Sequence, residues 1–283
     1  MEIQKVGVVG CGLMGSGIVE VCARAGYEVL VREVNDELLD TGLARVRKSL
    51  ARAVARGKVS QAQADQALAL VHGTLNLADF SDCDLVVEAA IENMAVKKEI
   101  FATLDGILPA HAILASNTSS LCITEMASST KRGDKVLGIH FFNPVPVMPL
   151  IEFVRTILTS DETMEAARQF GASLGKTMVT AKDTPGFIVN RLLIPYLLDA
   201  VRAYQDGLAS KEDIDTAIHL GLNHPMGPLT LLDFVGLDTC LFIADAMFDE
   251  YKDPRYAAPP LLRRMVLAGQ LGRKSGKGFY DYA

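Results

Sequence analysis

The sequence predicts an α/β protein: a doubly wound parallel sheet that carries a helical-hairpin insertion, followed by an all-helical domain. Three observations lead to this prediction. Up to residue 182, short apolar runs alternate with segments of helical periodicity, as in parallel sheets covered on both faces. One connection, residues 36–80, is too long for a simple crossover. After residue 182 the strand patterns stop and helical patterns take over.

Strands are expected where β-branched or apolar residues form short runs. The expected strands are 6–10, 28–33, 84–90, 112–116 and 135–141. Between the first two, residues 13–25 have the spacing of a helix, and Gly26 is a typical helix stop. Residues 94–105 are a further expected helix of this part.

The long connection is predicted to form two helices, about 36–57 and 60–71, joined by Gly57 and Lys58. Later in the chain, Pro185 and Gly186 would interrupt any continuing element, so that a domain boundary is expected after residue 184. Both resulting parts, 1–184 and 185–283, have ordinary domain sizes. The expected helices of the second part are 187–206, 211–220, 228–250 and 259–269.

Composition and charge argue against several classes of protein. The net charge is −6 at pH 7, whereas nucleic-acid binding proteins are usually basic. No apolar run approaches the roughly 20 residues of a membrane-spanning helix, and a cytoplasmic protein is expected. The five cysteines form no CxxC pair, so that neither a metal site nor a disulfide framework is expected.

A glycine-rich turn joins the first expected strand to the first expected helix. In its sequence, G-C-G-L-M-G, Gly10, Gly12 and Gly15 enclose Leu13 and Met14. Between a strand and a helix this motif indicates a dinucleotide site. The first glycine permits the tight turn, the second admits the pyrophosphate and the third lets the helix pack closely, while the helix N-terminus attracts phosphates.

The end of the second expected strand indicates which dinucleotide is bound. Glu33 stands where a carboxylate accepts hydrogen bonds from the adenosine ribose hydroxyls and repels the 2′-phosphate of NADP. NAD is therefore the expected cofactor. Arg32 could accommodate that phosphate instead, unless its side chain points to the opposite face of the strand.

The candidate base and its partner lie in two separate segments. His140 ends an expected strand, and ligands of such sheets bind at the carboxyl ends of the strands. Oxidation of an alcohol needs a base, a role that suits histidine near neutral pH. Glu152 lies in the apolar run PLIEFV, where a carboxylate needs a partner, and His140 would satisfy it and be oriented by it. A purely structural ion pair is the alternative.

Polar residues at two further places could contact a substrate. The segment SNTSS (116–120) follows another strand end, and its amide and hydroxyls suit a substrate oxygen; alternatively, these residues cap the helix that begins near ITEMA. Asn190, in the first helix of the second part, could face a cleft or bind loop backbone. His224 is expected to be a structural loop residue.

Four segments carry a resemblance that covers nearly the whole chain. In this order, SNTSS, HFFNPVPVM, PGFIVNR and GRKSGKGFY resemble the single-function 3-hydroxyacyl-CoA dehydrogenases. The resemblance implies a Rossmann-like NAD domain with a helical hairpin, and a helical domain that forms a homodimer. It also implies NAD-dependent oxidation of an (S)-3-hydroxyacyl-CoA, with 3-hydroxybutyryl-CoA as the expected short-chain substrate.

Carried over by position, the family's roles fall on named residues. The resemblance makes His140 the base and Glu152 its orienting partner, with Ser119 and Asn190 in contact with the substrate.

Positions of the family that contact NAD or close over it match four further residues: Glu92, Lys97, Asn143 and Lys274. The alternatives are a helix-start carboxylate for Glu92, a turn residue for Asn143 and solvated surface lysines for the other two.

The first helix of the predicted hairpin is strongly basic. Residues 45–58 hold six basic residues and no acidic one, and Arg45, Ser49, Arg52 and Arg56 recur on one helical face. Such a face suits a polyphosphate, although a solvated charged face is the commoner explanation of a charge run. The family uses this hairpin for coenzyme A, with a serine that matches Ser49 and a lysine where Arg56 stands, so an acyl-CoA is the expected substrate.

Two other functions stay open. One is a sugar-acid dehydrogenase of the same fold, of the gulonate type, which the basic hairpin and the GRKSGKGFY segment disfavour. The other is a structural or sensor protein that binds NAD without turnover, which the complete set of His140, Glu152, Ser119 and Asn190 disfavours.

Overall fold

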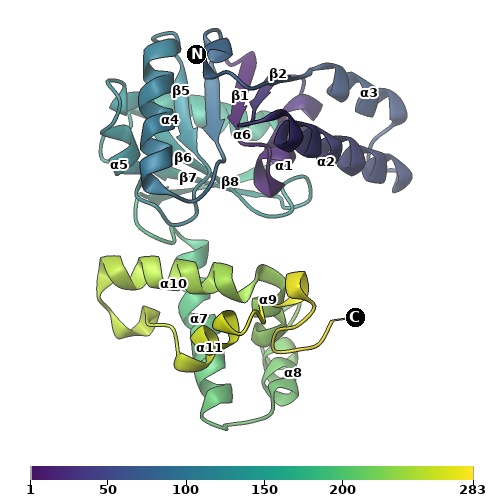
Figure 1. The fold of residues 1–283 in the computed structure, drawn as a ribbon, viewed down its shortest axis with the longest axis vertical. Coiled ribbons are helices and arrows are strands. Elements are labelled where there is room, and N and C mark those ends of the chain that lie inside the picture. Colours follow the sequence, from purple (N-terminus) through teal and green to yellow (C-terminus); the bar gives the residue numbers. More distant parts are fainter. Residues whose placement is uncertain (1, 283) are drawn as a thin grey trace. The chain divides into compact units, whose positions relative to one another are not determined.

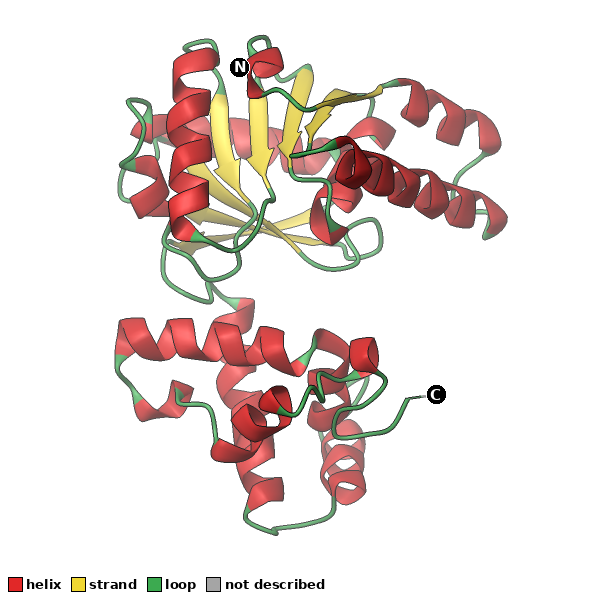
Figure 2. Ribbon diagram, in the orientation of Figure 1, coloured by secondary structure: helices red, strands yellow, loops and turns green. Residues whose placement is uncertain are grey.

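The structure, a computed structural model, describes residues 2–282. The chain divides into two compact units, Met1–Thr184 and Pro185–Ala283 (Figure 1). A sheet with helices on both faces forms the first unit, and helices joined by loops form the second (Figure 2). The predicted fold class is therefore confirmed.

A single sheet of eight strands forms the centre of the first unit, in the order β3-β2-β1-β4-β5-β6-β7-β8. Its strands are β1 (Lys5–Val9), β2 (Glu28–Arg32), β3 (Val71–Thr74), β4 (Leu85–Glu88), β5 (Ile113–Ser116), β6 (Val136–Phe141), β7 (Leu150–Arg155) and β8 (Thr177–Lys182). Three of them, β3, β7 and β8, are not among the strands expected from the sequence.

One pair of neighbouring strands departs from the parallel arrangement. Strands β6 and β7 are antiparallel, whereas all other neighbours are parallel. The connecting segment, residues 142–149, is shorter than the dozen or so residues that a parallel crossover requires. The chain must therefore turn back directly, and this reversal places the two strands side by side.

The helices of the first unit are α1 (Leu13–Arg24), α2 (Asp36–Ala55), α3 (Gln61–Ala69), α4 (Met94–Ile107), α5 (Ile123–Ala127) and α6 (Asp161–Ser173), with 3₁₀ turns at Leu77–Phe80 and Gly133–Lys135. Alternate strand residues, such as Val6 and Val8, share one core with α1 and α6. The opposite face, over which α4 and α5 lie in Figure 1, packs tightly at Gly7 and Gly138. A Cβ on Gly7 would overlap Phe80, and a Cβ on Gly138 would overlap Ile123.

The predicted hairpin consists of α2 and α3, which contribute Val46, Leu50 and Ala64 to the core that α1 also enters. Both helices begin at a side-chain cap, Asn35 for α2 and Ser60 for α3. Near its start, α2 crosses the glycine-rich turn at very short range, since a Cβ on Gly42 would lie 2.4 Å from the sulfur of Cys11. The hairpin is thus fixed beside the predicted dinucleotide site.

The second unit has a core of its own. Its helices are α7 (Val189–Gln205), α8 (Lys211–Gly221), α9 (Pro228–Val235), α10 (Leu237–Tyr251) and α11 (Pro260–Leu267), with 3₁₀ turns at Pro254–Tyr256 and Arg273–Ser275. The expected single helix 228–250 is two helices, because Gly236 adopts φ +104°, a conformation that only glycine reaches readily. No helix among residues 2–282 is long and apolar enough to cross a membrane.

Candidate active site

The glycine-rich turn has the geometry of a site for a phosphate group. Gly10 has φ +97°, and a Cβ on Gly15 would lie 1.9 Å from the carbonyl oxygen of Gly10, so the helix starts in direct contact with the turn. Around Gly12 there is open space, and no side chain caps the first turn of α1. Leu13 is largely exposed, and Met14 packs partly against the core. The amide groups of this helix end are therefore accessible to an anion.

Glu33 directly follows β2 and holds the glycine-rich turn. Its Oε1 accepts a hydrogen bond from the backbone N–H of Cys11 at 2.6 Å, and its Oε2 accepts one from the N–H of Val34 at 3.1 Å. The neighbouring Arg32 donates from Nε to the carbonyl oxygen of Leu75 at 3.3 Å. The carboxylate thus lies at the turn, while the arginine is engaged beyond β3.

The predicted histidine–carboxylate pair is present. His140 on β6 and Glu152 on β7 are direct partners in the antiparallel register, and Nδ1 of the imidazole lies 2.7 Å from Oε2 of the carboxylate. The glutamate is fully buried and the histidine side chain is 8% exposed. An ionised carboxylate at this place accepts from Nδ1–H, and a neutral ring in that tautomer has its lone pair at Nε2. A lone pair at Nε2 is what a general base requires.

The segment after β5 is built around Glu92. One oxygen of this carboxylate accepts from the hydroxyl of Thr118, from the backbone N–H of Ser119 at 3.3 Å and from the hydroxyl of Ser120 at 3.4 Å. Glu92 thus organises the turn that carries Ser119. Asn117, in the same turn, accepts from the N–H of Phe141 at 2.9 Å and ties the turn to the strand of His140.

Lys97 is not a solvated surface lysine. Its side chain on α4 is 1% exposed, and its Nζ lies 2.6 Å from Glu88 and 3.3 Å from Glu92. Asn143, in contrast, is exposed in the segment between β6 and β7. Of the four residues matched to cofactor contacts, Glu92 and Lys97 therefore contact each other, and the lysine is buried while the glutamate is partly exposed.

Asn190 and Lys274 belong to the second unit. Asn190 is half-buried in the first turn of α7. Lys274 forms an ion pair with Asp238, with Nζ at 2.5 Å from the nearer carboxylate oxygen, and it also lies against Gly236. His224 packs edge-on against Tyr196, with ring centroids 5.7 Å apart.

Each of the two units matches a separate domain of a known protein family. Residues 5–184 match the model of the 3-hydroxyacyl-CoA dehydrogenase NAD binding domain, and residues 186–282 match that of the C-terminal domain of the same family. The chain belongs to the 3-hydroxyacyl-CoA dehydrogenase family. It therefore carries the NAD binding domain of a family of oxidoreductases.

Similar members of the 3-hydroxyacyl-CoA dehydrogenase family come from several bacteria. A 3-hydroxybutyryl-CoA dehydrogenase of Mycobacterium tuberculosis is 55% identical over 282 residues, which cover 99% of each chain. One from Clostridioides difficile is 48% identical over 279 residues, again 99% of each chain. The crystal structure of (S)-3-hydroxybutyryl-CoA dehydrogenase PaaH1 from Ralstonia eutropha has a TM-score of 0.96 at 44% identity and full coverage of both chains.

The basic face of α2 in this dehydrogenase is open to solvent. Arg45, Arg52 and Arg56 are exposed and Ser49 is half-buried. Arg45 also reaches the carbonyl oxygen of Cys11 in the glycine-rich turn, at 3.4 Å. None of the basic residues 45–58 forms an ion pair with a carboxylate of residues 2–282. The face is therefore a row of uncompensated cations.

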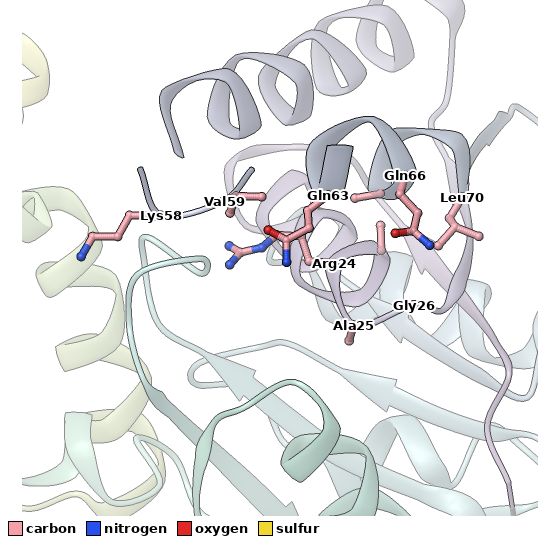
Figure 3. A pocket seen from close by; sticks show the side chains of 10 residues that line it. Arg24, Ala25, Gly26, Lys58, Val59, Gln63, Gln66 and Leu70 are labelled. Atoms are coloured by element: carbon pink, nitrogen blue, oxygen red, sulfur yellow. The ribbon is translucent and has the colours of Figure 1, made fainter. Parts of the chain in front are cut away.

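A hollow of about 350 Å³ lies between the C-terminal end of α1 and the hairpin (Figure 3). The labelled side chains of Arg24, Gln63 and Gln66 gather there, whereas Lys58 extends away from them. The hollow is at the opposite end of α1 from the glycine-rich turn. It is thus separate from the predicted cofactor site of this dehydrogenase.

Three residues that hold segments of the candidate site in place are not among those expected from the sequence. Glu88 is a buried carboxylate at the end of β4 that binds Lys97. Asp183 accepts from the N–H groups of Ile123 and Thr124, at 3.1 and 2.6 Å, so the cap of α5 comes from this aspartate and not from SNTSS.

Lys176 is the third residue that the sequence did not indicate. It donates to the carbonyl oxygens of Val145 and Met148, both at 2.6 Å, and so anchors the segment that carries Asn143. Burial lowers the pKa of this lysine. Only the strand-end position of Glu88 was a usable signal in the sequence, because the contacts of the other two are long-range.

Proposed function

We propose that this protein catalyses the reversible, NAD-dependent oxidation of (S)-3-hydroxybutyryl-CoA to acetoacetyl-CoA. The observation that carries the proposal is the buried pair of His140 and Glu152 at the 2.7 Å distance of a hydrogen bond, in a chain of the 3-hydroxyacyl-CoA dehydrogenase family. The choice of acyl chain is supported by relatives up to 55% identical that are named 3-hydroxybutyryl-CoA dehydrogenases.

In the proposed reaction His140 moves the proton of the substrate hydroxyl. Nδ1 remains bound to Glu152, and Nε2 takes the proton during oxidation and returns it during reduction. The imidazolium that forms is stabilised by the carboxylate beside it. Bound NAD supplies the acceptor for the hydride that leaves the substrate carbon.

The residues around the glycine-rich turn fit NAD. Gly10, Gly12 and Gly15, with Leu13 and Met14 between them, would hold the pyrophosphate at the start of α1, where the space around Gly12 is open.

Glu33 would bind the adenosine ribose. Glu92, Asn143 and Lys274 would contact the cofactor or close over it. Lys97, which is buried behind Glu92, would act by holding that carboxylate.

Substrate binding is assigned to both units. Ser119 and Asn190 would contact the reacting acyl group. The basic face of α2, with Ser49, Arg52 and Arg56, would bind the phosphates of coenzyme A, because its arginines are exposed and form no ion pair with a carboxylate among residues 2–282. In this proposal residues 1–184 bind NAD, and residues 185–283 complete the substrate site and form the dimer interface.

We also propose that the protein is a homodimer. Large apolar side chains of the second unit are exposed in the single chain, among them Leu208 at 77%, Leu220 at 71% and Leu267 at 86%. A covering partner would remove this apolar surface from water.

The five cysteines are all unpaired, which supports a reducing compartment and thus the cytosol.

The deciding experiment follows the loss of NADH absorbance after addition of acetoacetyl-CoA. We expect NADH to be consumed with turnover that saturates in both substrates. Turnover with a sugar acid but not with the acyl-CoA would contradict the proposal and favour the sugar-acid dehydrogenase. NADH binding without turnover on either substrate would favour a structural or sensor protein.

A further inference from the structure

Glu88 has no role in the proposed reaction, yet both of its carboxylate oxygens accept hydrogen bonds at the candidate site. It ends β4 and is 1% exposed. Its Oε1 accepts from Nζ of Lys97 at 2.6 Å and from the backbone N–H of Ala90 at 2.7 Å. Its Oε2 accepts from the hydroxyl of Ser116 at 2.6 Å. Lys97 lies on α4, Ala90 follows β4, and Ser116 ends β5. These contacts therefore connect Glu88 to segments near the carboxyl ends of the strands.

Through Lys97, Glu88 controls the charge balance around Glu92. The lysine lies between the two carboxylates, at 2.6 Å from the first and 3.3 Å from the second. If one of the two carboxylates loses its charge, the buried ammonium group keeps its Coulomb attraction to the other one only. Loss of the charge of Glu88 would therefore draw Lys97 and Glu92 together.

Glu92 in turn holds the turn of Ser119. Its Oε1 accepts from the hydroxyl of Thr118 and from the N–H of Ser119. Glu88 reaches the same turn by a second route, because the hydroxyl of Ser116 also accepts from the N–H of Thr118 at 3.2 Å. Glu88 thus supports the turn by two routes, one through Lys97 and Glu92 and the other through Ser116.

We propose that Glu88 is a positioning residue for Ser119. It fixes the turn through Lys97 and Glu92 on one side and through Ser116 on the other, and so sets the place of the serine hydroxyl. The proposal rests on the proposed contact between Ser119 and the substrate. Displacements of about 1 Å in a catalytic arrangement reduce rates by up to about 10²-fold, so that the effect should be visible in kcat.

The test combines Glu88→Gln with Ser119→Ala in a double-mutant cycle on kcat for acetoacetyl-CoA reduction. We expect Glu88→Gln to lower kcat by about 10-fold or more. If Glu88 acts through the serine, the double variant has the same kcat as Ser119→Ala alone. A kcat of the double variant equal to the product of the two losses would overturn the proposal, and so would unchanged kcat in Glu88→Gln with a lowered Tm.

Glu20→Gln is a matched control. Glu20 is an equally buried carboxylate of the same unit, on α1, and one of its oxygens has no hydrogen-bond partner among the described residues. Its replacement should leave kcat unchanged; a similar loss of kcat in this control would mean that burial, not position, explains the effect. Unchanged kcat in Ser119→Ala alone would refute the proposed substrate contact, and with it the inference.

Should Glu88→Gln fail to fold, Ser116→Ala removes one of the two supports and leaves the charges in place. We expect a smaller loss of kcat that again disappears in the Ser119→Ala background. A loss that persists there would overturn the proposal.

Discussion

At the scale of single residues, the proposed chemistry depends on the antiparallel register of β6 and β7. Residues directly opposite each other in such a pair have side chains on the same face, so the register brings His140 and Glu152 together. The short segment between the strands fixes this register. The backbone register therefore determines that these two residues are neighbours.

The position of Glu33 predicts a preference for NADH over NADPH. A 2′-phosphate would meet this carboxylate, whereas Arg32 is held by the carbonyl oxygen of Leu75. Hydrogen bonds to charged groups contribute about 1.5–3 kcal/mol, so the ratio of kcat/KM values should favour NADH by about 10-fold or more.

Glu33→Ala should reduce this ratio, and Arg32→Ala should leave it nearly unchanged. Steady-state kinetics with the two cofactors at equal concentrations measures it. A preference for NADPH in the unmodified protein would contradict the assignment of Glu33.

The cysteines predict a second property at this scale. Burial raises the pKa of Cys11 to about 12, with a further contribution from the charge of Glu33, and burial raises that of Cys240 to about 12. A raised pKa keeps a thiol protonated at pH 8, where only the thiolate reacts with disulfide reagents. Partial burial also raises the pKa of Cys122, so exposure is what distinguishes this thiol: we expect Cys122 to react first with such a reagent, and the four buried thiols to react only after unfolding.

Absorbance of the released thiolate counts the reactive cysteines, and Cys122→Ser should remove the early phase. Rapid modification of Cys11 with loss of NADH binding would show that the glycine-rich turn opens in solution.

The sequence was sufficient for some residues of the site and insufficient for others. Glu152 could be predicted because a carboxylate in an apolar run needs a partner. The burial of Lys97 could not be predicted, because it depends on Glu88, which reaches it from another element. Helical spacing alone does not distinguish such a lysine from one in solvent.

At the scale of elements, α2 has an exposed basic face to which the proposal assigns coenzyme A binding. Arg52 and Arg56 lie on the exposed basic side, and Arg47 points away from it by about half a helical turn. We expect Arg52→Ala and Arg56→Ala each to raise KM for acetoacetyl-CoA several-fold, with little change in KM for NADH. Some loss of kcat is also expected, since remote binding groups contribute to the transition state.

Arg47→Ala is the matched control on the same helix and should leave both KM values unchanged. Equal effects of all three substitutions would indicate general electrostatic attraction, and no effect of any would indicate a solvated face without a ligand.

Element boundaries show where local sequence is an incomplete guide. The N-terminus of α9 is capped by Asp215 of α8, which accepts from the N–H groups of Leu229 and Thr230 at 2.8 and 2.9 Å. In the same way, Asp183 caps α5 from the end of β8. Caps from distant residues leave no signature next to the helix they start, whereas the local caps of α2 and α3 do. Strand β3 is short and largely exposed at the sheet edge, so it lacks the apolar run by which strands are predicted.

At the scale of the whole molecule, the chain consists of two units, each with a core of its own. The cores of the two units share no residue. The boundary at Thr184 and Pro185 coincides with the residues that the sequence marks as breakers of secondary structure. This division could be seen in the sequence because the change from alternating strands and helices to helices alone is a change of pattern, not of single residues.

The proposed dimer predicts the mass of the particle in solution. We expect light scattering after gel filtration to give twice the 30.5 kDa of one chain at micromolar concentration. Leu267→Asp, which places a charge at a largely exposed apolar position of the second unit, tests whether this surface is the interface. A mass of one chain for the unmodified protein would contradict the proposal.

The central claim is that His140 transfers the proton and that Glu152 acts through it. General acid–base catalysis contributes about 10²–10⁴-fold, so His140→Gln should lose kcat by that factor while NADH affinity, measured by fluorescence, stays unchanged. Glu152→Gln should also lose kcat, and the double variant should be little slower than His140→Gln, because the two residues act as a unit. Near-normal kcat in a folded His140→Gln protein would contradict the claim, and losses that multiply in the double variant would show that Glu152 acts elsewhere.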